Sequence, residues 1–168
     1  LTGKIWKEHL NKQKQFFMSL APGQSVIVRS AKVDKRALAK LAVPKVFVPL
    51  EPREKIMLSF PNQLVKTKPL DIMAFWTADS STHDYWGKVT YAFDFDLIPE
   101  QIKACQILHL DQVRDWVRVK INGQDLGIVW SLPYQMNIPK GVLKDKNHIE
   151  LEVMNVSANR IRKLDREK

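Results

Sequence analysis

The fold is decided by the stretch VRVKINGQDLGIVW, which runs from Val117 to Trp130. Two alternating apolar runs meet there at Asn122-Gly123. In the first run, apolar side chains alternate with basic ones along an extended chain, with Val117, Val119 and Ile121 on one face and Arg118 and Lys120 on the other. Asn-Gly tolerates the positive φ angles of a two-residue type I′ turn, so the stretch predicts a β-hairpin with one buried face. Such hairpins occur in enzymes, binding modules and scaffolds alike, so the function must come from other features.

From residue 56 onward the chain is patterned as short strands separated by turn signals. The clearest strand is Lys88–Leu97, in which large apolar residues alternate with Lys, Thr, Ala and Asp. Eight short strands with intervening turns predict an all-β protein, most simply a jelly-roll β-sandwich. The expected strands are Ile56–Phe60, Asp71–Thr77, Lys88–Leu97, Cys105–Leu110, Trp116–Ile121, Leu126–Trp130, Gln135–Ile138 and His148–Met154.

The first fifty residues differ in character from the rest. Pro44, Pro49 and Pro52 fall within nine residues, which suits an extended connector and places a boundary near residue 50. We therefore expect a short appended segment over residues 1–50 and a sandwich over residues 51–168. The appended segment either packs on the sandwich or is the end of a preceding domain.

Composition excludes several classes of protein. In 168 residues, 45% of them apolar, no uninterrupted apolar run is long enough to span a bilayer. The first residues show no signal peptide. Cys105 is the single cysteine and the four histidines are scattered, so neither a disulfide nor a metal site is expected. We expect no cofactor, and a structural calcium ion is neither indicated nor excluded.

A net charge of +9 raises the question of a polyanionic partner. Basic residues concentrate in Lys32–Lys55 and in the tail Arg160–Lys168, but aromatic residues do not interleave with them as in single-strand nucleic-acid binders. A solvated basic face is therefore the preferred interpretation, and a nucleic-acid partner is not expected.

Two groups of residues resemble catalytic sets. Asp94 and Asp96 lie two apart on a strand, about 6.5 to 7 Å from each other, which overlaps the carboxylate separation of inverting glycosidases. Both belong to the polar face, however, where nothing would raise the pKa of one of them. The run from Ser80 to Asp84 contains the residue types of a nucleophilic triad, but its members are adjacent in one loop. No catalytic residue is assigned.

Aromatic residues at strand ends are the better candidates for a site. Flat rings at the rim of a sandwich can stack on the apolar face of a sugar, while Asn, Asp and Arg groups bind its hydroxyls. The alternative is that these rings close the ends of the core. The rings concerned are Trp76, Tyr85, Trp86, Trp130 and Tyr134.

Three longer stretches, FWTADSSTHDYWGKVTYAFDF, LHLDQVRDWVRVKINGQDLGIVWSLPYQMNI and HIELEVMNVSANRIRKLDR, resemble the sugar-binding β-sandwich module of the glycoside hydrolase family 2 superfamily. The resemblance is closest to the galactose-binding-like domain at the C-terminal end of α-L-rhamnosidase-like enzymes of glycoside hydrolase family 106. The matching elements are Trp76-Thr77, Gly87–Tyr91, the Asn122-Gly123 hairpin with Gly127 and Trp130, Pro133-Tyr134, Asn155 and Asn159-Arg160.

The resemblance implies a noncatalytic, carbohydrate-binding accessory domain of a secreted or periplasmic bacterial enzyme whose catalytic domain lies elsewhere. Phe17–Arg29 likewise resembles the closing strands of a preceding sandwich. The implied structural residues are Asn122 and Gly123 for the turn, Gly127 for a close backbone approach, and Asn155. The carbohydrate-binding candidates are Trp76, Trp86, Trp130, Tyr134, Asn159 and Arg160.

Two features depart from the family pattern, and two alternatives stay open. Lys88 stands where the module more often has a small residue, and the positive charge is unusual for it. The alternatives are a purely structural module that supports a catalytic domain, and a polyanion-binding module that uses the basic stretches.

Overall fold

The structure is a computed structural model that describes residues 47–61, 67–105, 107–111, 113, 116–155, 161 and 164–166. Most of the expected N-terminal segment, Asn159 and Arg160 lie outside these residues. Residues 161 and 164–166 of the described part are helical. The described elements with defined bounds are eight strands, one α-helix and one 3-10 helix. They are β1 (Ile56–Ser59), β2 (Lys68–Leu70), η1 (Trp76–Ala78), β3 (Lys88–Asp96), α1 (Pro99–Ala104), β4 (Ile107–His109), β5 (Trp116–Ile121), β6 (Gln124–Val129), β7 (Gln135–Asn137) and β8 (Lys146–Met154).

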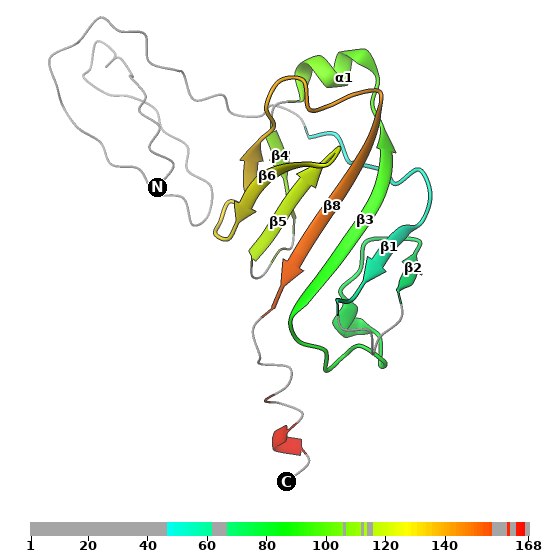
Figure 1. The fold of residues 1–168 in the computed structure, drawn as a ribbon, viewed down its shortest axis with the longest axis vertical. Helices are drawn as coiled ribbons and strands as arrows, with labels where there is room; N and C mark the ends of the chain where they lie inside the picture. The colour runs from blue at the N-terminus through cyan, green and yellow to red at the C-terminus, as the bar shows by residue number, and fades with distance from the viewer. Residues whose placement is uncertain are drawn as a thin grey trace, which may run out of the picture.

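The strands form two antiparallel sheets, and the predicted all-β sandwich is confirmed. The large sheet has the order β2-β1-β3-β8-β5-β6, while β4 and β7 pair with each other (Figure 1). At its centre β3 and β8 pair over nine residues, from Lys88 opposite Met154 to Asp96 opposite Lys146. Because β8 is the last of the described strands and β3 one of the first, the centre of the sheet depends on a long-range pairing.

One face of the large sheet is the core. Val89, Val117, Val119 and Ile121 are completely buried, as their alternation in the sequence predicts. Leu108 of β4 is buried in the same cluster, so the small sheet covers part of this face. We call the opposite face of the large sheet, which carries the intervening polar residues, the outer face.

The β5–β6 hairpin has the predicted two-residue turn. Ile121 pairs with Gln124, and the two residues between them have positive φ angles, 52° at Asn122 and 79° at Gly123. Gly127 was expected to allow another part of the backbone to approach closely. It does not have this role, because a Cβ atom there would meet nothing within 4 Å. Its φ of 102° accompanies a register shift between Val119 and Lys120, so the position requires the backbone freedom of glycine.

Two regions differ from the prediction. Asp71–Thr77 is not a strand, and β2 instead lies just before it, with Leu70 opposite Ile56. Pro69 has no backbone N–H to donate, so it could not pair fully with a strand on each side. It lies on β2, an edge strand with β1 as its one described neighbour in the sheet. The second difference is α1, which was not predicted although Pro99 stands at its first turn, where proline is favoured.

The loop after η1 is organised by one carboxylate. Asp79 accepts hydrogen bonds from the backbone N–H and the hydroxyl of Ser81, at 2.8 and 2.7 Å. The ammonium group of Lys68 in β2 lies 2.7 Å from the same carboxylate. These donors, with Lys68 first, hold the pKa of Asp79 well below its ordinary value of 3.8. Lys68 also donates to the hydroxyl of Ser81, and the ionised carboxylate of Asp79 strengthens this connection between the loop and β2.

The lowered pKa of Asp79 predicts that its contribution to the stability of the fold depends on pH. Its pKa is lower in the folded than in the unfolded chain, so its stabilising effect is complete above about pH 4 and declines as the pH falls below that value. In urea unfolding between pH 7 and pH 2, Asp79→Asn should be less stable than wild type at neutral pH, and the difference should shrink on acidification. A difference that stays constant across this range would contradict the assignment.

Candidate functional site

Trp76 belongs to the core rather than to an exposed surface. Its side chain is 7% exposed, and its indole N–H donates to the carbonyl of Tyr85 at 3.4 Å. Its ring also contacts Tyr91, with centroids 6.4 Å apart. A ring packed in this way cannot offer a face to a sugar, so the binding role expected for Trp76 gives way to a structural one.

Trp130 and Trp86 are the most exposed of the candidate rings. Trp130 is 70% exposed directly after the last residue of β6, and Trp86 is 45% exposed just before β3. Tyr134 is half-buried and packs against the core. Exposed indoles can stack on a sugar ring, whereas Tyr134 offers less of its surface.

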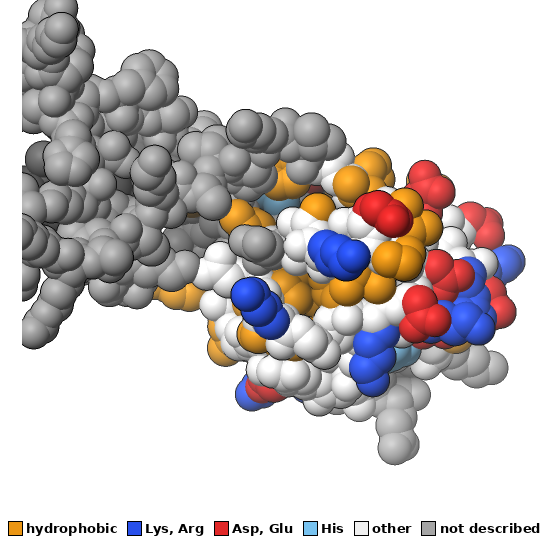
Figure 2. Space-filling view, turned by 90° about the horizontal axis from the view of Figure 1, so that it is seen from above, with side chains coloured by type: hydrophobic (Ala, Val, Ile, Leu, Met, Phe, Trp, Pro, Cys, Tyr) orange, Lys and Arg blue, Asp and Glu red, His pale blue; other side chains and the backbone are white. Residues whose placement is uncertain are grey.

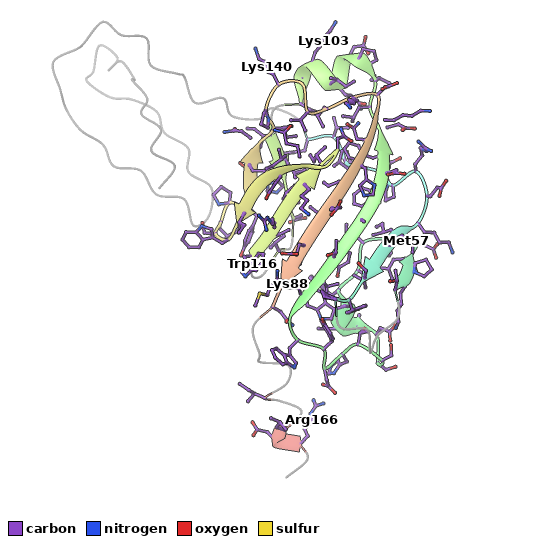
Figure 3. The ribbon with its side chains drawn as sticks, viewed as in Figure 1. Met57, Lys88, Lys103, Trp116, Lys140 and Arg166 are labelled. Carbon is purple, nitrogen blue, oxygen red and sulfur yellow. The ribbon has the colours of Figure 1, made fainter. Side chains whose placement is uncertain are left out.

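Strand pairing places Trp86 and Trp130 at the same end of the large sheet. Met154 of β8 is opposite both Lys88 of β3 and Trp116 of β5. The pairing of Val117 with Val129 then brings Trp130 to the position across from Trp116. We call Trp86, Trp116, Trp130 and Met154 the aromatic rim (the end marked by Lys88 and Trp116 in Figure 3).

Trp116 and Met154 were missed in the sequence, although a signal for both was present. Trp116 directly precedes Val117, which is completely buried, so the period-2 pattern alone puts Trp116 on the outer face. Met154 alternates with Val153 in the same way. Trp116 is half-buried and Met154 is 36% exposed.

Asn155 fastens this end of the sheet. Its side-chain oxygen accepts a hydrogen bond from the backbone N–H of Gly87 at 2.9 Å. Its backbone N–H donates to the carbonyl of Gly87 at 3.3 Å. These two bonds hold the residue after β8 against the residue that separates Trp86 from β3. The ends of β3 and β8 are thus positioned together.

Beside the rim, the outer face carries charged side chains in matched pairs. A shallow depression there is lined by Thr90, Arg118, Lys120, Glu150 and Glu152. The cations have carboxylate partners: Lys88 lies 3.2 Å from Glu152, Lys120 lies 3.7 Å from Glu150, and Arg118 lies 2.6 Å from Asp125. The hydrogen bond from Arg118 lowers the pKa of Asp125, and the same bond raises the pKa of Arg118.

The two aspartates that resembled a catalytic pair each have a basic partner. An oxygen of Asp94 lies 2.6 Å from Nδ1 of His148, and Asp96 lies 3.6 Å from Arg53. Both carboxylates are about half exposed, at 53%. The structure therefore pairs each carboxylate with a basic side chain rather than with the other carboxylate, as expected of exposed structural residues.

The basic excess of the chain does not come from the sandwich. Residues 1–46 contain ten Lys and Arg but two Asp and Glu, whereas residues 47–155 contain twelve Lys and Arg and fourteen Asp and Glu. Seen from above, the end of the molecule near α1 shows acidic and basic side chains next to one another (Figure 2). A polyanion would find no surface of uniform positive charge on the described strands.

The part of the chain that the structure describes holds no group of three or more His, Cys, Asp or Glu side chains that could bind a metal ion. None of its helices is long and apolar enough to cross a membrane.

Comparison with known proteins finds similarity to parts of glycoside hydrolases. The structure of a rhamnosidase from Novosphingobium sp. PP1Y matches 77% of this chain with a TM-score of 0.63 and 26% sequence identity. A putative beta-glucuronidase from Formosa agariphila is 26% identical over 110 residues, which is 62% of this chain. A beta-glucuronidase structure from Bifidobacterium dentium matches 63% of the chain with a TM-score of 0.48 and 17% identity. No protein-family model matches the chain.

The fold is an all-β sandwich, and the matches to the rhamnosidase and to the putative beta-glucuronidase support a domain associated with glycoside hydrolases. The chain spans 13% of the Novosphingobium rhamnosidase chain and 10% of the putative beta-glucuronidase. It is therefore similar to a small part of each of these enzymes.

Proposed function

We propose that this chain is a noncatalytic, carbohydrate-binding accessory domain of a bacterial glycoside hydrolase, secreted or periplasmic, with the aromatic rim as its binding site. The observation that carries the proposal is the exposure of Trp130, a large apolar ring that is 70% accessible at the end of a well-packed sheet. Exposed apolar side chains gathered in one place mark interaction sites. The similarity to a small part of a rhamnosidase supports a carbohydrate as the ligand.

Trp130 and Trp76 provide a matched pair of substitutions for this proposal. Trp130→Ala should change the free energy of unfolding by no more than about 0.5 kcal/mol, because the ring is mostly in solvent. Trp76→Ala should cost about 3 to 5 kcal/mol, because that ring is buried. Only Trp130→Ala should remove binding from an otherwise intact fold, as read on a glycan array and by denaturant unfolding of both variants.

The array should cover neutral plant and bacterial oligosaccharides, acidic polysaccharides and DNA, at low and high salt. We expect binding to a glycan that resists salt. Binding that appears only to acidic polymers and falls steeply with salt would favour the polyanion-binding alternative instead, since that loss tracks the number of neutralised charges.

A second candidate function is that of a structural module that packs against a catalytic domain. A separate patch of exposed apolar residues favours it. Ile72, Met73 and Phe75 follow β2 and are 74, 49 and 44% exposed. They lie beyond the edge strand, whereas the aromatic rim lies at the ends of β3, β8, β5 and β6. The patch and the rim consist of different residues, so the two functions can be tested by separate substitutions.

A further inference from the structure

A row of outer-face residues crosses four neighbouring strands at the end where the aromatic rim lies. Strand order places β3, β8, β5 and β6 side by side, and this first row consists of Lys88, Met154, Trp116 and Trp130, with Trp86 two residues before Lys88. Three inter-strand spacings of about 4.8 Å give the row from β3 to β6 a length of ~14 Å. A ligand that contacts the whole row must therefore be extended and must run across the strands.

A second row of the outer face runs parallel to the rim. Thr90, Glu152 and Arg118 are opposite one another on β3, β8 and β5. Each lies two residues along its strand from a residue of the first row, a distance of roughly 6.5 to 7 Å. The rim thus offers apolar contact, and the parallel row offers a hydroxyl, a carboxylate and a guanidinium. Such a combination suits a chain that is apolar on its ring faces and rich in hydroxyls at its edges.

The charges of this face select against an acidic glycan. Lys88 and Lys120 have glutamate partners, and Arg118 pairs with Asp125. A uronate placed in the shallow depression would meet the carboxylates of Glu150 and Glu152, while the two cations that also line it, Arg118 and Lys120, already have carboxylate partners. Like charges in contact repel, whereas sugar hydroxyls can donate to these same carboxylates.

We propose that the aromatic rim binds an extended neutral oligosaccharide that lies across β3, β8, β5 and β6, with Trp116 at the centre of the contact. This inference rests on the proposed carbohydrate-binding function and deepens it by naming the ligand class and a further binding residue. The hydroxyls of the glycan would be read by Glu152 and Arg118 in the row beside the rim. An isolated monosaccharide covers too little of the row to use more than one ring.

The test is isothermal titration calorimetry of the full chain against a length series. The probes are rhamnose-, galactose-, glucose- and xylose-based oligosaccharides of one to six units, with oligogalacturonides of the same lengths as the acidic series. We expect affinity for at least one neutral series to rise at least tenfold from one to four units and then to level off. Trp116→Ala should weaken binding of the long chain about two- to tenfold, the range of a single aromatic contact.

Two variants separate this effect from a loss of structure. Trp116→Phe keeps an aromatic ring at the position and should restore most of the affinity. Phe75→Ala removes an exposed ring outside the rim and should leave binding unchanged. If Trp116→Ala and Trp116→Phe weaken binding equally, the stacking role assigned to Trp116 is overturned.

The remaining outcomes distinguish this inference from the proposed function. If a monosaccharide binds as tightly as the longer chains, the carbohydrate-binding function stands and the extended site is overturned. Tighter binding of oligogalacturonides would overturn the selection for neutral glycans. If neither series binds at any length, the proposed function itself fails, and this inference fails with it.

Discussion

Replacing Phe95 by Ala is expected to lower the free energy of unfolding by about 3 to 5 kcal/mol, the usual cost of deleting a fully buried phenyl ring. Phe95 is 1% exposed and lies on β3, between β1 and β8. Its ring is 6.2 Å from that of Phe93, the next residue on the same face of the strand. The substitution would leave a cavity beside the pairing that holds the centre of the sheet together.

Urea or guanidinium unfolding followed by circular dichroism measures this loss. Phe75→Ala is the matched control, because Phe75 is 44% exposed and lies outside the regular strands. We expect the control to change stability by about 0.5 kcal/mol or less. Equal losses in the two variants would mean that the interior of β3 is not the core of the protein.

The second large effect is expected at Asn122, in the β5–β6 turn. Its side-chain nitrogen donates to the carbonyl of Val142 at 2.8 Å and to Oδ1 of Asn147 at 2.9 Å. Its side-chain oxygen accepts from the N–H of His148 at 2.9 Å. One side chain therefore joins the turn both to β8 and to the loop before it.

Asn122→Ala should cost about 2.5 to 5.5 kcal/mol. Three hydrogen bonds are lost at about 0.5 to 1.5 kcal/mol each, and alanine at a φ of 52° adds strain of about 1 kcal/mol. Asn147 is only 4% exposed and loses one of its partners, which adds to the cost.

Asn122→Gly divides this loss into its two causes. Glycine adopts the positive φ angle without strain, so it removes only the hydrogen bonds and should cost less than alanine. Denaturant unfolding of both variants gives the comparison. If glycine and alanine are equally destabilising, the backbone angle makes no contribution; if glycine is neutral, the hydrogen bonds make none.

The strands that were predicted well are those whose evidence is local. In Trp116–Ile121 and Lys88–Asp96, the period-2 pattern is unbroken and one face is buried, so the residues themselves identify strand and face. The Asn122-Gly123 turn is also a local property, because few residues tolerate two consecutive positive φ angles. Asp71–Thr77 was misassigned because its apolar residues do not mark a buried strand, and Ile72 is 74% exposed.

The candidate site was only partly predictable, because local sequence does not show which aromatic rings are buried. Trp86 and Trp130 are near turns, and their positions in the sequence were enough to mark them as rim residues. Trp76 is also an aromatic residue near a turn, yet its indole is buried in contact with Tyr91. No local pattern separates these cases, because burial depends on what packs against a ring from elsewhere in the chain.

By itself, the sequence determined the all-β class, the hairpin at Asn122-Gly123 and the buried face of the central strands, since side-chain alternation and turn chemistry act over a few residues. Only the tertiary structure decided that Trp86, Trp116, Trp130 and Met154 share one end of the large sheet. Trp116 and Trp130 are joined by the β5–β6 hairpin, but Trp86 and Met154 lie far from each other and from this hairpin in the chain. Their alignment depends on the pairing of β8 with both β3 and β5, which the hydrogen-bonding register of the whole sheet sets.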